Sequence, residues 1–316
     1  MDQLNLPGFN WLIPLWIVAA GAVAAAVGLA IGLRVFRFAA PKTSAIAWAT
    51  AKECRSQPLF FAVIALGFVL VLLSAFLPFG TFGDDIKMMK DTGLMMILVL
   101  SIVLAVSSAS VSVSEEVDGR TALTVLSKPV GRRQFIVGKL IGVLIPVVIF
   151  YIVVGAWFLA VTSYKVKFEA RELSLPEPNW RQCQTEMLQT VPALVLAFFE
   201  TVVLTALSIA VSTRLAMVPN LLICATVYVV GHILPLLVQS AVGKLPIVAF
   251  MGQLLSTVLP VLEHFNIQAA IASGRDSALS AAEWLSYLGW AGAYCLLYTT
   301  LMLVVSLLLF EDRDLA

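Results

Sequence analysis

The sequence predicts an all-α membrane protein whose helices cross the bilayer several times, and two observations lead to this expectation. Hydrophobic residues make up 60% of the 316-residue chain and charged residues only 12%, about half the share that is usual in soluble proteins. The apolar residues are gathered into runs of about twenty, the length that an α-helix needs to cross a hydrocarbon layer about 30 Å thick. The short segments of alternating polarity that are typical of membrane barrels are absent from the sequence.

Seven of these runs are expected to span the membrane, and the basic residues between them predict the orientation. The runs cover residues 11–33, 58–79, 94–113, 140–163, 191–212, 217–242 and 284–310. Twelve of the twenty Lys and Arg residues fall in 34–57, 114–139, the turn at Arg214 and the tail at Arg313. Because basic residues favour the cytoplasmic side, we expect the N-terminus outside and the C-terminus in the cytoplasm of a multi-pass cell-membrane protein.

Three segments outside these runs have predicted roles. Residues 44–57 mix apolar and charged residues, which indicates an interfacial helix before the second span. Residues 164–190 contain Pro176 and Pro178 and are expected to form an irregular exterior loop. Residues 245–262 are apolar but interrupted by prolines, so 243–281 is interpreted as a re-entrant segment, with an eighth span as the alternative.

The longest charged segment in the chain, residues 114–139, lies between the third and fourth spans. Thr121–Leu126 is expected to form a short helix with Leu123 and Leu126 on one face, and Pro129 would end it. Gly131 then occupies an N-cap position, with Gln134 at the third position of the next helix, which Arg132 and Arg133 begin. The pattern predicts a rigid cytoplasmic helix-turn-helix; the alternative is an ordinary loop anchored by its basic residues.

A second interpretation of this segment is catalytic. Glu115, Glu116 and Arg120 have the E-E-x-x-x-R spacing of a family of intramembrane proteases. Such an enzyme also needs histidines in other helices, and the two histidines of this chain, His232 and His264, do not match that family's further motifs. The protease is therefore retained as the alternative function.

Four stretches in order resemble ABC-2 type transporter permeases. The first is residues 44–58, and the second is the charged segment, with Glu115-Glu116-x-x-Gly119-Arg120-Thr121 followed by Leu126-Ser127-Lys128-Pro129-Val130-x-Arg132-Arg133-x-Phe135 and Gly138-Lys139. The third is Leu259-Pro260-x-Leu262-Glu263-x-Phe265-Asn266, and the fourth is the ending Phe310-Glu311-Asp312-Arg313-Asp314-Leu315. The resemblance covers residues 44–316 and implies a six-span core, so residues 1–43 are expected to form an extra N-terminal transmembrane helix.

The resemblance implies a permease subunit of an ATP-driven transporter, most often an exporter, which works as a homodimer or heterodimer beneath cytoplasmic ATPase subunits. The chain contains no G-x-x-x-x-G-K-[ST] phosphate loop, so ATP and Mg are expected in the partner ATPase, and no catalytic, cofactor or metal residue is assigned here. The resemblance, together with the predicted helix that carries Leu123, assigns ATPase coupling to ten residues: Glu115, Glu116, Gly119, Arg120, Thr121, Leu123, Leu126, Pro129, Arg132 and Arg133. The charge distribution predicts membrane lipid, not nucleic acid, as the other partner.

Glu200 is the candidate for the transport pathway. It is a carboxylate well inside a predicted span, where an ionisable group is costly and is by default a functional candidate. The alternative is a group satisfied by water or by the nearby Thr201 and Thr205. His232 is expected to stand alone in its span and to serve in packing. The spans show no cluster of charges in the sequence, which favours lipid, peptide, glycan or a hydrophobic drug as cargo, with metal-centre maturation and ion extrusion as the alternatives.

Overall fold

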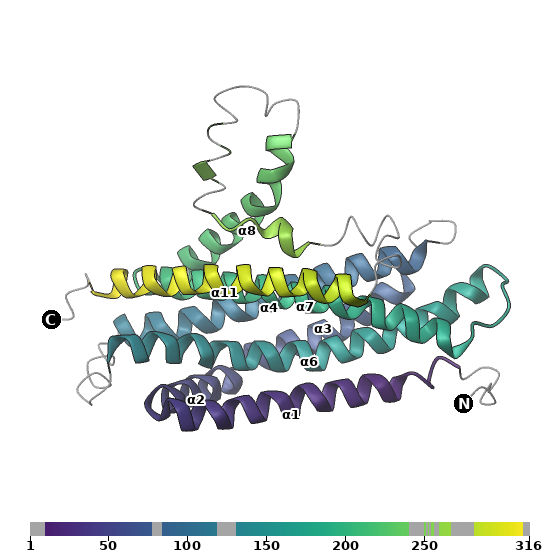
Figure 1. Cartoon of the computed structure of the whole chain (residues 1–316), viewed down its shortest axis with the longest axis horizontal. Coiled ribbons are helices and arrows are strands. Elements are labelled where there is room, and N and C mark those ends of the chain that lie inside the picture. The colour runs from purple at the N-terminus through teal and green to yellow at the C-terminus, as the bar shows by residue number, and fades with distance from the viewer. Residues whose placement is uncertain are drawn as a thin grey trace.

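The protein is a bundle of long, nearly parallel α-helices, as Figure 1 shows. The structure, a computed structural model, describes residues 10–77, 84–118, 131–239, 250, 252, 254–255, 259–266 and 281–311. Within them the helices are α1 (Leu15–Ala39), α2 (Pro41–Ser56), α3 (Pro58–Phe76), α4 (Asp85–Asp118), α6 (Arg132–Glu172), α7 (Trp180–Ser212), α8 (Met217–Gln239) and α11 (Ala281–Glu311), with a 3₁₀ turn η2 (Leu262–Phe265).

Seven of these helices are long and apolar enough to cross a membrane: α1, α3, α4, α6, α7, α8 and α11. This confirms the predicted all-α polytopic class. The remaining helix, α2, is too polar to span and is short, as an interfacial helix would be. Figure 1 shows α8 diverging from the direction of the other spans.

Two of the spans continue well beyond their apolar runs. The segment 164–190 is mostly helical, because α6 extends to Glu172 and α7 begins at Trp180, so the expectation of a long irregular loop was wrong. The connection is residues 173–179, and Asn179 is the N-cap of α7. Its N–H donates to Gln182 Oε1 at 3.1 Å, and its carbonyl oxygen accepts from the Gln182 N–H at 2.9 Å. The prolines at 176 and 178 lie inside this short connection and therefore do not prevent the flanking helices.

The two ends of the bundle collect different connections. One end holds α2, the end of α4, the start of α6, the α7–α8 turn and the end of α11, and the C-terminus lies there in Figure 1. Phe135 and Phe310 stack at 5.7 Å between ring centroids, and Arg214 Nε donates to the Leu309 carbonyl at 2.9 Å. We call this the α2 end. The opposite end, which we call the outer end after the predicted orientation, holds the start of α1 and the α6–α7 connection, and there Ser163 Oγ donates to the Trp11 carbonyl at 2.8 Å.

The close packing of α2 against α6 depends on two glycines one turn apart. A Cβ atom on Gly138 would lie 2.9 Å from Ile46 and 3.1 Å from the Thr43 carbonyl oxygen. A Cβ atom on Gly142 would lie 2.6 Å from Thr50 Cβ and 2.8 Å from the Ala47 carbonyl oxygen. Since backbone atoms cannot rotate away, α2 fits against α6 only where these side chains are missing.

Gly142→Ala is therefore expected to destabilise the fold. The added methyl group must separate α2 from α6, and overpacking of this kind typically costs roughly 1–3 kcal/mol. Thermal unfolding of the detergent-purified protein would measure it as a lowered Tm. Gly28→Ala is the matched control, because a Cβ atom there meets nothing within 4 Å, and its Tm should be unchanged or slightly higher. Equal Tm values for the two variants would contradict the proposed tight α2–α6 contact.

The N-terminal helix α1 lies at the edge of the bundle. No residue of Leu15–Ala39 is buried, and the helix packs along α6 and α2. The Gly28-x-x-x-Gly32 pair does not form a close helix contact within the chain, because neither position has an atom within 4 Å of a Cβ atom. The face of α1 turned away from α6 is thus left to lipid or to another protein.

The segment before α11 returns to the bundle. Leu262 of η2 is buried and would lie 3.0 Å from a Cβ atom on Gly231 in α8, and the Val261 N–H donates to the Tyr294 hydroxyl of α11 at 2.9 Å. Residues 259–266 are therefore covered by α8 and α11. Most of 243–281, on which the re-entrant and eighth-span interpretations differ, lies outside the described residues.

Candidate functional site

The charged segment 114–139 begins in the last turns of α4 and ends in the first turns of α6. Glu115 and Glu116 lie in the α4 helix, and Arg132 and Arg133 are exposed at the start of α6. The Gly131 N–H donates to Gln134 Oε1 at 3.3 Å, which confirms the predicted N-cap and third-position pair. The other predicted coupling residues lie outside the described residues, as does the predicted Thr121–Leu126 helix: Gly119, Arg120, Thr121, Leu123, Leu126 and Pro129. The side chains of Glu115 and Glu116 are also not described.

The helices that carry this segment are held tightly at the α2 end. Phe135 and Ile136, in the first turn of α6, are buried against the core. Cys54 of α2 contacts the Ser108 carbonyl of α4 with its Sγ atom at 4.0 Å. Burial, with a smaller contribution from the adjacent Glu53, raises the pKa of the Cys54 thiol to about 11. A force applied to the charged segment would therefore be passed directly to α2, α4 and α6.

Glu200 of α7 is buried in the membrane interior and faces His232 of α8. Its Oε1 atom lies 3.5 Å from His232 Nε2, and 1% of the residue is exposed. The expectation that His232 stands alone was therefore wrong, because α8 packs against α7 at this height. The Thr201 and Thr205 hydroxyls do not satisfy Glu200; they donate to the backbone carbonyls of Ala197 and Thr201.

The hydrogen bond on the other side of the imidazole limits the states of this pair. His232 Nδ1 lies 3.0 Å from the Tyr228 carbonyl oxygen, which can only accept, so Nδ1 carries a proton. At 3.5 Å, Nε2 and Glu200 Oε1 make no hydrogen bond, and this carboxylate oxygen has no hydrogen-bond partner within the described residues. A closer approach of the two side chains would be needed for a proton to pass between them. The two residues together can hold one mobile proton between α7 and α8.

A cluster of three hydroxyl groups lies next to this pair. Ser101 of α4, Tyr151 of α6 and Thr201 of α7 are joined by Ser101–Tyr151, Ser101–Thr201 and Tyr151–Thr201 contacts of 3.0, 2.8 and 2.9 Å between oxygens. Further along, Asn220 Nδ2 of α8 donates to Ser110 Oγ at 2.7 Å and to Ser208 Oγ at 2.8 Å. Polar groups thus line the seam of α4, α7 and α8 through much of its length, and the serine-rich run 101–114 is the sequence signal for it.

A second polar cluster lies at the outer ends of α4, α6 and α7. Lys90 Nζ pairs with Glu186 Oε2 at 2.5 Å, and Lys165 Nζ lies 3.7 Å from Asp85 Oδ2. The Asp85 backbone N–H donates to Glu169 Oε1 at 3.2 Å, and both lysines are almost fully buried. This charge cluster could not be predicted from the sequence, because its members come from three distant segments: 85–90, 165–169 and Glu186.

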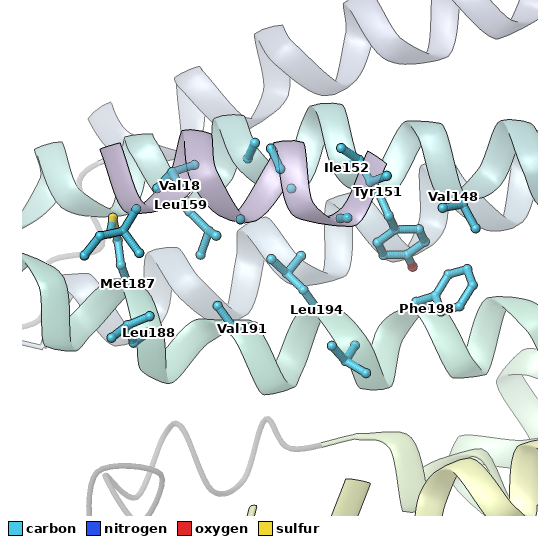
Figure 2. Close-up of a pocket in the computed structure, with 17 residues that line it drawn as sticks. Val18, Val148, Tyr151, Ile152, Leu159, Met187, Leu188, Val191, Leu194 and Phe198 are labelled. Carbon is cyan, nitrogen blue, oxygen red and sulfur yellow. The ribbon is translucent and has the colours of Figure 1, made fainter. Parts of the chain in front are cut away.

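An apolar cavity of about 510 Å³ lies between α1, α6 and α7, as Figure 2 shows. Tyr151 and Phe198 lie at one end of it, with ring centroids 5.5 Å apart, and Met187 and Leu188 lie toward the other. The Tyr151 hydroxyl that joins the three-hydroxyl cluster is the polar group of an otherwise hydrophobic lining. The volume is in the range of small-molecule sites, and the lining suits an apolar guest.

The two histidines are not placed as the protease interpretation would require. His232 contacts Glu200, and the His264 ring packs edge-on against Tyr294 at 5.6 Å. In the part of the chain that the structure describes, no three His, Cys, Asp or Glu residues are grouped as a metal site would require.

Residues 44–315 match a family model described as ABC-2 family transporter protein. The match begins within α2 and leaves α1 outside it. A comparison with curated protein sequences finds no match.

Proposed function

The chain belongs to the ABC-2 family of transporter proteins, and from this premise we propose that it is the permease subunit of an ATP-driven exporter whose ATPase is a separate cytoplasmic chain. The match over residues 44–315 is the observation that carries the proposal. The lack of a phosphate loop in the sequence agrees with it, since ATP and Mg then belong to the partner. Two permease chains, identical or different, would form the transmembrane unit.

The charged segment is the proposed docking surface for the ATPase. It connects α4 to α6, and these two helices pack on each other, on α2 and on α7. Closure of the ATPase on ATP would push the segment, and the packed helices would tilt together. Leu123 and Leu126 are the proposed apolar anchors, with Glu115, Glu116 and Arg120 setting the register.

The interior of the bundle supports a mainly hydrophobic cargo. The cavity between α1, α6 and α7 is apolar, and the Glu200–His232 pair with the adjacent hydroxyl cluster is the proposed polar part of the pathway. The two meet at Tyr151, which lines the cavity and bonds to Thr201, the neighbour of Glu200.

Purification of the tagged chain from its native membranes in mild detergent tests the proposal. We expect a second chain with a phosphate loop to be retained, and the complex to hydrolyse ATP. A preparation that holds no ATPase, but cleaves a membrane-embedded peptide, would favour the E-E-x-x-x-R protease instead.

The proposed orientation makes a labelling prediction. All four native cysteines, Cys183 at the outer end included, are free and buried, so introduced cysteines are needed. Glu172→Cys, exposed at the outer end, should react with a membrane-impermeant maleimide in intact cells. Lys52→Cys, exposed on α2, should react only after permeabilisation, and the wild type should stay unlabelled. The reverse pattern would invert the topology.

A further inference from the structure

A second cavity, of about 290 Å³, lies between α1 and α2 at the α2 end. Its wall has two parts. The apolar part includes Ala30, Leu33 and Ile145, and the polar part is formed by Arg34, Arg37 and Ser44. Its lining residues include none of the charged segment 114–139 and neither Glu200 nor His232, and five of the nine precede the family match.

Within the described residues, no carboxylate balances the charge of the two arginines. Arg34 and Arg37 are three residues apart on α1 and therefore lie on one face of the helix, which is the face lining the cavity. Neither guanidinium makes an ion pair with a carboxylate within the described residues. Guanidinium groups bind phosphate oxygens in a two-pronged geometry, so an anion with a phosphate is their natural partner.

The position of the cavity identifies the kind of phosphate compound. The arginines lie in the last two turns of a membrane-spanning helix, where headgroups meet the hydrocarbon. Trp48, a residue type that favours this interface, also lines the cavity. A free anion would gain nothing from the apolar wall, whereas a phospholipid matches both parts.

The seam between α1 and α6 provides room for a lipid acyl chain that runs from the arginines toward the middle of the bilayer. The small cavity reaches Ile145 of α6, and the large apolar cavity begins one turn further, at Val148, opposite Ala25 of α1. From Arg34 to Ala25 the helix rises roughly 14 Å, about half of the hydrocarbon thickness. An acyl chain extended from Arg34 along α1 would therefore be long enough to reach the large cavity.

We propose that the cavity between α1 and α2 binds one anionic phospholipid, with its phosphate on Arg34 and Arg37 and an acyl chain along the α1–α6 seam. The site does not depend on the proposed transport function. It differs from ordinary basic anchoring because it has a defined stoichiometry and a shape that can be filled.

The test is native mass spectrometry of the purified chain titrated with phosphatidylglycerol. The wild type should retain one lipid, and Arg34→Gln/Arg37→Gln should bind it at least about tenfold more weakly, since two charge-assisted contacts are lost. Lys42→Gln/Lys52→Gln is the matched control: it removes two charges from the same end, outside the cavity, and should bind like the wild type. Phosphatidylcholine should be retained less, and excess inorganic phosphate should not displace the lipid.

A second variant distinguishes binding in a shaped cavity from general attraction to positive charge. Ala30→Trp keeps both arginines but fills the cavity, so it should also lose the lipid, and it remains informative if the double Gln variant aggregates. Wild-type retention by either variant would overturn the proposal. Equal loss in the lysine control would show diffuse attraction instead of a site, and displacement by inorganic phosphate would show a site for a free anion.

Discussion

Replacing Leu123 and Leu126 with aspartate is expected to release the ATPase from the permease, or to leave it bound with hydrolysis no longer linked to transport. Apolar anchors in a partner's groove usually carry most of the binding energy of such a contact. The substitution removes both apolar anchors and places two carboxylates without charged partners in that groove. Co-purification of the two chains, and the cargo-stimulated ATPase rate in lipid vesicles, would measure the loss.

Two comparisons make this result interpretable. Lys52→Asp places a carboxylate at the same end of the bundle but on α2, where it is exposed, and should leave both measurements unchanged. Reversing Glu115 and Glu116 to lysine should weaken coupling less than the leucine variant, because charges at the rim of an interface are partly solvated. If the leucine variant couples like the wild type, residues 114–139 are an ordinary anchored loop.

Glu200→Gln is expected to slow transport by roughly tenfold or more, which corresponds to about 1.4 kcal/mol or more in the barrier. Glutamine keeps the shape of the side chain but cannot exchange a proton with His232 Nε2, 3.5 Å away. The rate of cargo uptake into inverted vesicles would measure the effect. His232→Gln should give a similar loss, and the double variant should be little worse than either one, since neighbours that act as a unit are not additive.

The control for this prediction lies one turn further along the same helix. Thr205 is equally buried, but its hydroxyl donates only to the Thr201 carbonyl of its own helix. Thr205→Val should therefore transport at close to the wild-type rate. If Glu200→Gln also transports normally, or if the effects of Glu200→Gln and His232→Gln multiply, the pair is structural and the pathway lies elsewhere.

The sequence was sufficient for the helices and insufficient for the contacts between them. The class of fold and the number of spans follow from apolar length, and the cap at Gly131 follows from local chemistry, because both depend on neighbours in the chain. The pairing of Glu200 with His232, thirty-two residues apart, depends on how α7 and α8 pack. The helical extension through 164–172 was also missed, because charged residues were interpreted as a loop although Lys165 is buried against Asp85.

The same packing explains why the extra helix was recognised as a span while its role was not. Hydropathy identifies α1 as a span, but no residue of Leu15–Ala39 is buried. The sequence of α1 therefore shows no apolar face from which a neighbouring helix could be predicted. Its contribution becomes visible only beside α2 and α6, where it completes both cavities.

The length of α6 has a mechanical consequence. The helix has 41 residues, so it is roughly 60 Å long, well over the thickness of the bilayer. Pro146 lacks the N–H of a normal helical residue and is the natural pivot of this rod. It divides α6 into an inner arm of roughly 21 Å and an outer arm of roughly 39 Å. If α6 rotated as a rigid rod about this point, the Lys165–Asp85 contact, roughly 29 Å from Pro146, would move about 1.4 times as far as the start of the helix. A push by the proposed ATPase at the start of α6 would then be enlarged at this ion pair, and we expect the pair to separate.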